Sequence, residues 1–495
     1  MEMPGPDPEI IGRRENIIKA LQAFIPANSI IAEEEGLRPF ECDGLTAYRE
    51  LPLIVVLPEN ADQISRILNY CYQSGVKIVP RGAGTSLSGG ALPLADAITL
   101  GLSKLNKIIE VDYENRCVVA EPGVTNLAIT EAVEDCGYYY APDPSSQIAC
   151  TIGGNVAENS GGVHCLKYGL TTNNLLGLKM ILMDGQTINL GGKHMDPGGY
   201  DLMGIVTGSE GLLGVITEVT VRILPKPPTA RALLMGFNSS EAAGKCVASI
   251  IGAGIIPGGM EMMDRKAIHA AENFVNAGYP LDAEAILIVE LDGPVEEVDY
   301  LTDKVSEISC MAGATFVRSS VNEEERLLFW AGRKAAFPAV GRISPDYYCM
   351  DGTIPRHRLP EVLKRIADAA VRYGLGVANV FHAGDGNLHP LILYDANKPG
   401  ELESAEAFGA EILKLCVEVG GVLTGEHGVG VEKRDLMETM FTEVDLMQQQ
   451  RIKCAFDPKQ LLNPGKVFPK LHRCAELGRL HINGGEMRFP NLPRF

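Results

Sequence analysis

Three glycine-rich segments constrain the fold of this 495-residue chain more than any other feature. They read PRGAGTSLSGG (80–90), TIGGNVAENSGG (151–162) and TGSEGLLGVIT (207–217). Glycine lets the backbone approach a ligand closely, and successive N–H groups can form a concave anion site. Taken alone, the first segment could equally be an ordinary turn. Together, the three segments favour a backbone that wraps an extended ligand, for which a dinucleotide is the natural candidate.

The first glycine segment does not match the common nucleotide-binding loops. Gly82 and Gly84 are followed by Leu87 where the GxGxxG pattern requires its third glycine, and the next element reads as a strand. No Gly-Lys-Ser/Thr sequence follows, as a Walker loop would require. We therefore expect neither a Rossmann fold nor a P-loop.

A proline-rich segment, PKPPTAR (225–231), marks the clearest break in the chain. Before it, 53–57 reads as a buried strand and 59–75 as a helix capped by Asn60 and ended by Gly75. After it, strands (283–293, 374–384) alternate with helices (360–374, 405–421). We expect two domains and a tail: 1–225 with a core at about 50–225, 226–440, and 441–495 returning to the first domain.

The composition excludes several functions. With 44 Lys plus Arg against 63 Asp plus Glu, the net charge of −19 argues against binding nucleic acid or anionic lipid directly. We find no secretory signal and no apolar run of about 18 residues, so a cytoplasmic chain is expected. The twelve cysteines contain no CxxC pair, which argues against an iron–sulfur cluster or a zinc ribbon within the chain.

Two histidines flank a turn in FHAGDGNLHP (381–390). The β-type runs on either side predict a hairpin. His382 and His389 would lie roughly 5 Å apart at Cβ if directly paired, and two imidazoles can bind one divalent metal. Two histidines that only hydrogen-bond the backbone of a turn are the alternative.

The segment GVLTGEHGVG (421–430) supplies Glu426 and His427. A carboxylate is a suitable third ligand beside two imidazoles. Neighbours on an extended segment point in opposite directions, so Glu426 would face the metal and His427 elsewhere, unless the segment turns and both line a cavity. A metal-dependent hydrolase with His427 as base is one alternative function, but it leaves the glycine segments unexplained.

A third candidate is LLFWAGRKAAFP (327–338). Trp330, Arg333, Lys334 and Phe337 share a helical face at i, i+3, i+4 and i+7. An arginine at this place can bind a carboxylate through two hydrogen bonds. A solvated Arg-Lys pair is the alternative.

The segments VPRGAGTSLSGG, PDPSSQIACTIGGNVAENSGGVHCLKYG and GSEGLLGVITEVTV resemble the FAD-binding domain of the vanillyl-alcohol oxidase and p-cresol methylhydroxylase superfamily. From about Pro39 onward the chain is similar to FAD-linked D-2-hydroxyacid dehydrogenases, and most similar to the flavin-bearing D subunits of bacterial glycolate oxidases. The resemblance implies an α+β fold with a two-part FAD-binding domain, an α/β substrate cap domain, and a C-terminal segment that packs on the FAD domain.

The resemblance also implies where FAD binds. The residues 81–86 would hold its pyrophosphate, the second glycine segment would line the flavin and ribityl chain, and Ile216 would meet the adenine. Because the first loop has no histidine, non-covalent FAD is implied; His164 and Cys165 are the alternative attachment points. The implied cofactor-binding residues are Pro80, Arg81, Gly82, Ala83, Gly84, Thr85, Ser86, Pro142, Ser145, Thr151, Gly153, Gly154, Asn155, Ser160, Gly161, Gly211, Ile216, Glu426 and Asn463.

By the same resemblance, HAGDGNLHP and GEHG supply a divalent metal site and a catalytic histidine. His382, His389 and Glu426 would bind zinc, manganese or iron, and His427 would be the base. Arg333 would bind the substrate carboxylate, and the three histidines would also contact substrate.

Two positions distinguish this chain from relatives that oxidise longer diacids. Leu391 stands where they carry an asparagine, and Cys349 stands near their lysine. These differences favour a small 2-hydroxy acid over a dicarboxylate such as 2-hydroxyglutarate.

The implied function is the oxidation of glycolate to glyoxylate, with D-lactate as the alternative substrate. A hydride would leave the α-carbon for the flavin while His427 takes the hydroxyl proton. Because the chain has no CxxC pair of its own to pass electrons on, an iron–sulfur electron-transfer subunit is an expected partner, as the resemblance also implies. The resemblance further implies a second FAD-domain-like subunit. Contact with the inner membrane face is expected only through these partners.

Overall fold

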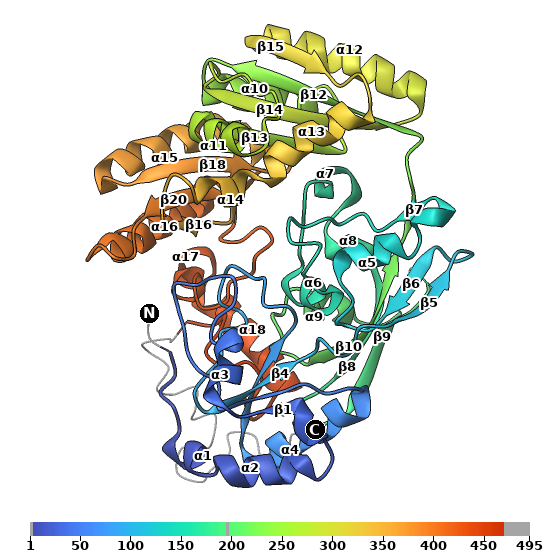
Figure 1. Ribbon diagram of the computed structural model, residues 1–495, viewed down its shortest axis with the longest axis vertical. Coiled ribbons are helices and arrows are strands. Elements are labelled where there is room, and N and C mark those ends of the chain that lie inside the picture. Colours follow the sequence, from blue (N-terminus) through green and yellow to red (C-terminus); the bar gives the residue numbers. More distant parts are fainter. Residues whose placement is uncertain (1–2, 195–197, 470–495) are drawn as a thin grey trace.

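The computed structural model describes residues 3–194 and 198–469. Figure 1 shows two N-terminal sheets below a third, larger sheet. Among the described residues, no helix combines the length and the apolar character needed to cross a membrane.

The first sheet contains β1 (Ile30–Ile31), β2 (Ile54–Val56), β3 (Lys77–Arg81) and β4 (Ala97–Gly101), beside helices α1 (Pro8–Gly12), α2 (Arg14–Gln22), α3 (Glu34–Leu37) and α4 (Ala61–Ser74). Its order is β1-β2-β4-β3, and β2 and β3 both run parallel to β4. The helix α4 crosses over between β2 and β3, as a parallel arrangement requires. The predicted caps of α4 are confirmed: Asn60 accepts the N–H of Gln63, and Gly75 is left-handed at φ 73°.

The second sheet is antiparallel and contains β5 (Ile108–Asp112), β6 (Cys117–Ala120), β8 (Leu175–Ile181), β9 (Thr187–Gly191) and β10 (Val215–Arg222), beside α5 (Asn126–Glu131), α6 (Ile152–Glu158), α7 (Cys165–Tyr168), α8 (Thr171–Asn174) and α9 (Leu202–Val206). Its order is β5-β6-β10-β8-β9. The predicted hairpin over Asp184 and Gly185 is confirmed, because β8 pairs with β9.

The break at the proline-rich segment is shorter than the sequence predicts. Pro225 lies in β11 (Leu224–Pro225), which pairs with β7 (Tyr138–Tyr139), and β12 already begins at Thr229. A proline can occupy the end of a short edge strand because no ladder N–H is needed there.

The third sheet contains β12 (Thr229–Phe237), β13 (Gly259–Asp264), β14 (Ala285–Gly293), β15 (Ala314–Ser319), β16 (Asp346–Cys349), β18 (Gly376–Phe381) and β20 (Pro390–Tyr394). Its helices are α10 (Ser240–Gly252), α11 (Arg265–Val275), α12 (Val295–Met311), α13 (Glu323–Lys334), α14 (Ala336–Val340), α15 (Leu359–Tyr373) and α16 (Glu401–Glu418). The strand order is β15-β12-β14-β13-β18-β20-β16, and β17 (Gly352–Thr353) pairs separately with β19 (Asn387–Leu388). Residues 229–430 are called the large-sheet region below.

Side chains alternate between the two faces of this sheet. One face packs on α10, α12, α15 and α16 through residues such as Phe237 and Val289. The other packs on α11, α13 and α14 through residues such as Leu234 and Met263. Glu261 is two positions before Met263 on β13, so its side chain is on the face that α13 covers.

A short segment around α7 connects the N-terminal half to the large sheet (Figure 1). His164 lies between two carboxylates, with Nδ1 2.9 Å from Asp143 Oδ2 and Nε2 3.2 Å from Glu290 Oε1 of β14. Lys167 donates to Asp292 Oδ1 at 2.6 Å. The pairs with Glu290 and Asp292 join segments more than 120 residues apart in the sequence.

The chain returns to the first sheet after α17 (Met437–Met440) and α18 (Glu443–Phe456). Lys453 Nζ of α18 donates to the carbonyl of Leu212 at 2.6 Å. On β3, the N–H of Ile78 donates to Leu461 and its carbonyl accepts from Asn463. Residues 457–467 therefore contact the strand that leads into the first glycine segment.

Candidate functional site

One cavity of about 680 Å³ brings the three glycine segments together with side chains of the large-sheet region. The predicted site residues that line it are Pro80, Arg81, Gly82, Ala83, Gly84, Thr85, Ser86, Ser145, Thr151, Gly153, Gly154, Asn155, Ser160, Gly211, Ile216, Arg333, His382, His389, Glu426 and His427.

Three predicted residues are outside this lining. The carbonyl of Pro142 accepts from the side chain of Asn126, and Asn463 donates to the carbonyl of Gly90. Gly161 lies beside Glu426, because a Cβ atom added to Gly161 would be 2.6 Å from Oε2 of Glu426. The structure gives these three residues supporting contacts around the cavity.

The glycine-lined part of the cavity fits FAD by two observations. Thr151 Oγ1 and Asn155 Nδ2 are buried in the lining without a hydrogen-bond partner, and buried polar groups ordinarily have one. A Cβ on Gly82 would lie 2.5 Å from Thr151 Oγ1, so glycine is needed for the two loops to approach. These groups are suited to a polar cofactor with many hydroxyl and phosphate oxygens.

Arg81 supports its own loop from within. Its Nη1 donates to the carbonyl of Cys42 at 2.7 Å, and a Cβ on Gly84 would overlap its guanidinium. Gly84 has φ +72°, a conformation that favours glycine. Arg81 thus places a positive charge beside the loop that lines the cavity.

The predicted hairpin around FHAGDGNLHP is confirmed, but its register is offset. Asn379 of β18 pairs with Pro390 of β20, and His382 pairs with Asn387. His382 and His389 are therefore diagonal neighbours rather than direct partners. Their rings are 5.0 Å apart at an angle of 86°, so their edges can point to one place.

That place is Glu426. Its Oε1 lies 3.3 Å from His382 Nε2 and 3.1 Å from His389 Nε2. Burial alone raises the pKa of Glu426, but His382 and His389 outweigh it and hold that pKa well below its ordinary value. Two nitrogens and one carboxylate oxygen converge in the way that a divalent cation requires, and a cation would replace the protons they share.

The segment around Glu426 bends, so both Glu426 and His427 line the cavity. The sequence allows an extended segment or one that turns, and the structure has the turned one. His427 Nε2 is 3.7 Å from Glu426 Oε1. Burial lowers the pKa of His427 to about 4, so its imidazole is neutral near pH 7 and can accept a proton.

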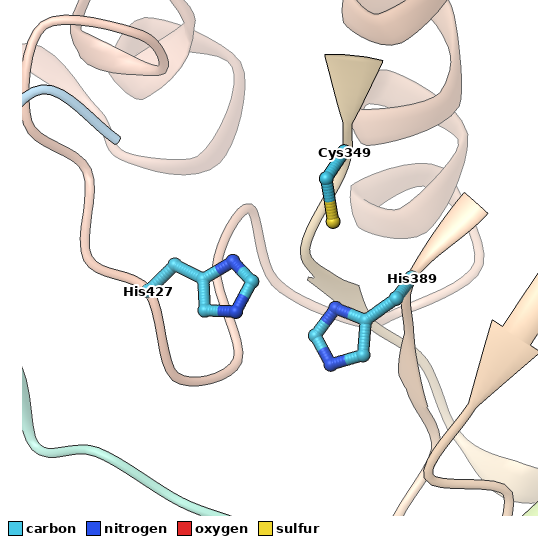
Figure 2. A group of neighbouring side chains, drawn as sticks. All are labelled: Cys349, His389 and His427. Carbon is cyan, nitrogen blue, oxygen red and sulfur yellow. The ribbon is translucent and has the colours of Figure 1, made fainter. Parts of the chain in front are cut away.

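Figure 2 shows a second group, in which the thiol of Cys349 points toward the rings of His389 and His427. Their possible ligand atoms lie within 4.8 Å of one another. The two rings are stacked at 18°, so their lone pairs run side by side rather than converging. Burial also raises the pKa of Cys349 well above its ordinary value, which keeps the thiol protonated. This group is the poorer of the two metal-binding candidates.

Arg333 does not share a continuous helical face with Phe337, because α13 ends at Lys334 and α14 begins at Ala336. Lys334, although exposed, and Phe337 nevertheless line the cavity together with Arg333, whereas Trp330 donates to Glu290 outside the lining. Arg333 is only 2% exposed. It is therefore a buried cation in the cavity wall, unlike a solvated surface pair.

The sequence did not identify two acidic residues that organise the site. Glu261 is 1% exposed, lies 2.7 Å from Arg333 Nη2, and has its other oxygen 2.7 Å from His382 Nδ1. Asp351 is fully buried and accepts from the backbone N–H groups of Gly425 and His427. A single acidic residue in an apolar strand run, as in GGMEMMD, is the signal that could have revealed Glu261.

A second pair of acidic residues lies where the glycine segments meet the GEHG loop. Glu210 accepts from the N–H groups of Val429 and Gly430 at 2.6 and 2.7 Å. Glu158 lines the cavity beside it, and burial together with Glu210 raises its pKa well above the ordinary value. Both residues occur in the glycine segments that the sequence singled out, but their carboxyl groups were not predicted to matter.

Comparisons with known proteins agree with this geometry. An FAD binding domain model matches residues 52–191, and a model of the C-terminal domain of FAD linked oxidases matches residues 226–467. The glycolate oxidase subunit GlcD of Escherichia coli K12 is 56% identical over 97% of each chain. A D-lactate dehydrogenase of Archaeoglobus fulgidus is 34% identical over 92% of this chain and 99% of its own.

The fold also matches a solved structure. p-Cresol methylhydroxylase has a TM-score of 0.79 at 17% identity, covering 92% of this chain and 97% of its own. The predicted α+β fold of the vanillyl-alcohol oxidase and p-cresol methylhydroxylase type is confirmed. The hydrolase alternative is not retained, because an FAD binding domain accounts for the glycine segments. The chain therefore belongs to the family of FAD-linked oxidases, together with the glycolate oxidase subunit GlcD.

Proposed function

We propose that this chain is the flavin-bearing subunit of a glycolate-oxidising complex, which converts glycolate to glyoxylate. The observation that supports this most directly is the single cavity that contains both the glycine-lined FAD site and the Arg333, His382, His389, Glu426 and His427 set. The 56% identity to a glycolate oxidase subunit favours glycolate over D-lactate, whose dehydrogenase is more distant.

The substrate carboxylate binds Arg333. Its Nη2 lies 2.7 Å from Glu261 but makes no aligned hydrogen bond there, so a buried N–H remains for an acceptor in the cavity. A buried donor without an acceptor costs about 1–3 kcal/mol, and a bound carboxylate removes that cost. Arg333 thus fixes one end of a 2-hydroxy acid.

His427 takes the proton of the α-hydroxyl group. Its backbone N–H is held by Asp351 at 2.9 Å, and its carbonyl accepts from Ser88 Oγ at 2.8 Å. Both contacts fix the backbone from which the ring enters the cavity wall. When bound, FAD supplies the redox chemistry by accepting the hydride from the α-carbon.

His382, His389 and Glu426 would hold a divalent cation, zinc, manganese or iron. Such an ion supplies Lewis acidity, which lowers the pKa of a coordinated hydroxyl group. The other predicted cofactor-binding and substrate-binding residues that line the cavity keep their predicted roles in this proposal. Non-covalent FAD remains part of the proposal.

Electrons leave through partners. The sequence has no CxxC pair to bind an iron–sulfur cluster, so we propose an iron–sulfur subunit as the acceptor, and a second FAD-domain-like subunit beside it. Placement at the inner membrane face through these partners stays a prediction. We also retain the division into an FAD-binding domain (1–225), a cap domain (226–440) and a C-terminal segment (441–495) as a proposal.

A steady-state assay with a dye acceptor tests the function. Glycolate should be oxidised with glyoxylate as product, D-lactate more slowly, and D-2-hydroxyglutarate not measurably. Arg333→Lys should raise the KM for glycolate by about 10–100-fold, as expected for a lost hydrogen bond to a charged group. The matched change Arg342→Lys should leave KM unchanged, because the guanidinium of Arg342 lies outside the cavity lining, where it donates to the carbonyl of Asn273 and lies over the ring of Phe274. Faster turnover of D-lactate would favour the alternative substrate, and no turnover of either acid would contradict the proposal.

A further inference from the structure

The carboxylate of Glu261 connects two parts of the site that are distant in sequence. Its Oε1 lies 2.7 Å from His382 Nδ1, and its Oε2 lies 2.8 Å from Arg333 Nε. Glu261 is 1% exposed, and it comes from the central strand β13 of the large sheet. One rigid side chain therefore contacts both a proposed metal ligand and the proposed carboxylate-binding residue.

The contact with His382 determines which ring nitrogen is available. A carboxylate accepts a hydrogen bond, so Nδ1 carries a proton in this pair, and Nε2 is the nitrogen left to bind a cation once the cation displaces the proton shared with Glu426. Nε2 is the atom that faces Glu426 at 3.3 Å. Glu261 thus selects the ligand-competent tautomer and fixes the plane of the ring, which is how carboxylates support metal-binding histidines.

The contact with Arg333 determines which edge of the guanidinium is available. Glu261 lies against the Nε–Nη2 edge: its Oε2 accepts from Nε at 2.8 Å and lies 2.7 Å from Nη2, which makes no aligned hydrogen bond. A buried guanidinium can rotate only at a high cost when one of its edges is held by a charged partner. The remaining N–H groups are therefore presented to the cavity in one orientation.

The charges of the groups that would meet here also favour the carboxylate of Glu261. A divalent cation, a monocarboxylate substrate, Glu426 and Arg333 together have one excess positive charge. Glu261 neutralises it within a buried site, where an uncompensated charge is costly.

We propose that Glu261 is the positioning residue that couples metal binding to substrate binding in this enzyme. The inference rests on the proposed function. It predicts that one substitution, Glu261→Gln, weakens both binding events, although Glu261 is expected to touch neither the metal nor the substrate.

The test compares Glu261→Gln with Arg333→Met. For Glu261→Gln, affinity for added Zn²⁺ or Mn²⁺ should fall by about 10–100-fold, the usual effect of removing such a supporting partner, and the KM for glycolate should rise. For Arg333→Met, KM should rise while metal affinity stays near the wild-type value, because His382 keeps its carboxylate. Metal affinity is measured by equilibrium dialysis with the FAD-loaded chain, so this readout does not depend on activity.

Asp264→Asn is the matched control. Asp264 lies on the same strand, and its carboxylate caps α11 and accepts from Asn379. This variant should lose stability but keep metal affinity and KM. If Glu261→Gln does not fold, the double variant Glu261→Gln/Arg333→Met removes the unpaired guanidinium, and its metal affinity should still be below that of Arg333→Met.

The inference would be overturned if Glu261→Gln bound the metal as tightly as wild type, or if the double variant bound it as tightly as Arg333→Met. Either result would leave the proposed function intact. A wild-type chain that binds no divalent metal, or does not oxidise glycolate, would instead contradict the proposed function itself.

Discussion

The carboxylate of Asp351 accepts a hydrogen bond from the backbone N–H of His427 at 2.9 Å. The same carboxylate accepts from Lys433 Nζ at 3.0 Å, and both side chains are fully buried. Burial alone raises the pKa of Asp351, but Lys433 and the nearby histidines outweigh it and hold that pKa below its ordinary value. Asp351 is therefore a charged anchor for the loop that contains Glu426 and His427.

Asp351→Asn should destabilise this loop. The asparagine side chain keeps one acceptor oxygen, but its NH₂ group would face backbone N–H groups that also need an acceptor. In addition, Lys433 loses its charged partner. Breaking a buried ion pair on one side costs about 3–5 kcal/mol, so the free energy of unfolding should fall by about that amount, and turnover should fall with it. Asp346→Asn is the control, because Asp346 lies at the start of β16, shortly before Asp351 in the chain, and is only partly buried. It should change neither quantity. Equal effects of the two variants in denaturant titrations would contradict this role of Asp351.

His427→Gln should remove the base and keep the cofactor. Turnover should fall by about 10²–10⁴-fold, the usual contribution of general base catalysis, while the flavin absorbance of the purified chain stays at the wild-type level. His357→Gln, at an exposed histidine of the same region, is the control. Near-normal turnover in His427→Gln would remove the base assignment.

Removal of the metal should stop turnover without releasing FAD. Dialysis against a chelator should remove the ion from His382, His389 and Glu426. FAD should stay bound, because the polar atoms of Thr151 and Asn155 that are proposed to contact it are not metal ligands. Activity should return when zinc, manganese or iron is added back, which also identifies the metal. A chain that keeps full turnover with no metal detected by elemental analysis would refute the metal site.

The ion pairs of His164 predict a pH-dependent stability. Burial alone lowers the pKa of His164, but Asp143 and Glu290 outweigh it and hold the pKa well above its ordinary value. The unfolded pKa is about 6.5, so the stabilisation is complete below that pH and is lost as pH rises through the folded pKa. At about pH 6, His164→Gln should lower the free energy of unfolding by about 1.5–3 kcal/mol.

The measurement for His164 is a set of denaturant unfolding curves across pH. The difference between wild type and His164→Gln should shrink at alkaline pH. His269→Gln, whose ring contacts only the carbonyl of Leu281 at the surface, should show a small and constant difference. A wild-type advantage that grows with pH would have the wrong sign for this account.

Much of the fold was predictable because local signals were strong. The caps of α4 at Asn60 and Gly75, the hairpin over Asp184, and the hairpin around His382 each depend on residues close in sequence. The family resemblance then supplied what local patterns could not, including the roles expected of Arg333 and Glu426.

The parts that were missed depend on contacts between distant segments. Glu261 meets His382 across 121 positions, and Asp351 meets His427 across 76. Neither partner can be recognised from spacing, because the pairing is created by strand order in the large sheet. The register of His382 and His389 was missed for a related reason: the constant pairing from Asn379–Pro390 to His382–Asn387 places His389 two positions beyond the partner of His382, and the sequence does not fix where the turn closes.

The central claim is that FAD and a small 2-hydroxy acid react within one cavity, and anaerobic spectroscopy of the FAD-loaded chain tests it most directly. The account predicts that glycolate bleaches the flavin bands and forms one equivalent of glyoxylate, with D-lactate bleaching them more slowly. Flavin bands that stay unchanged after glycolate and D-lactate are added would contradict it.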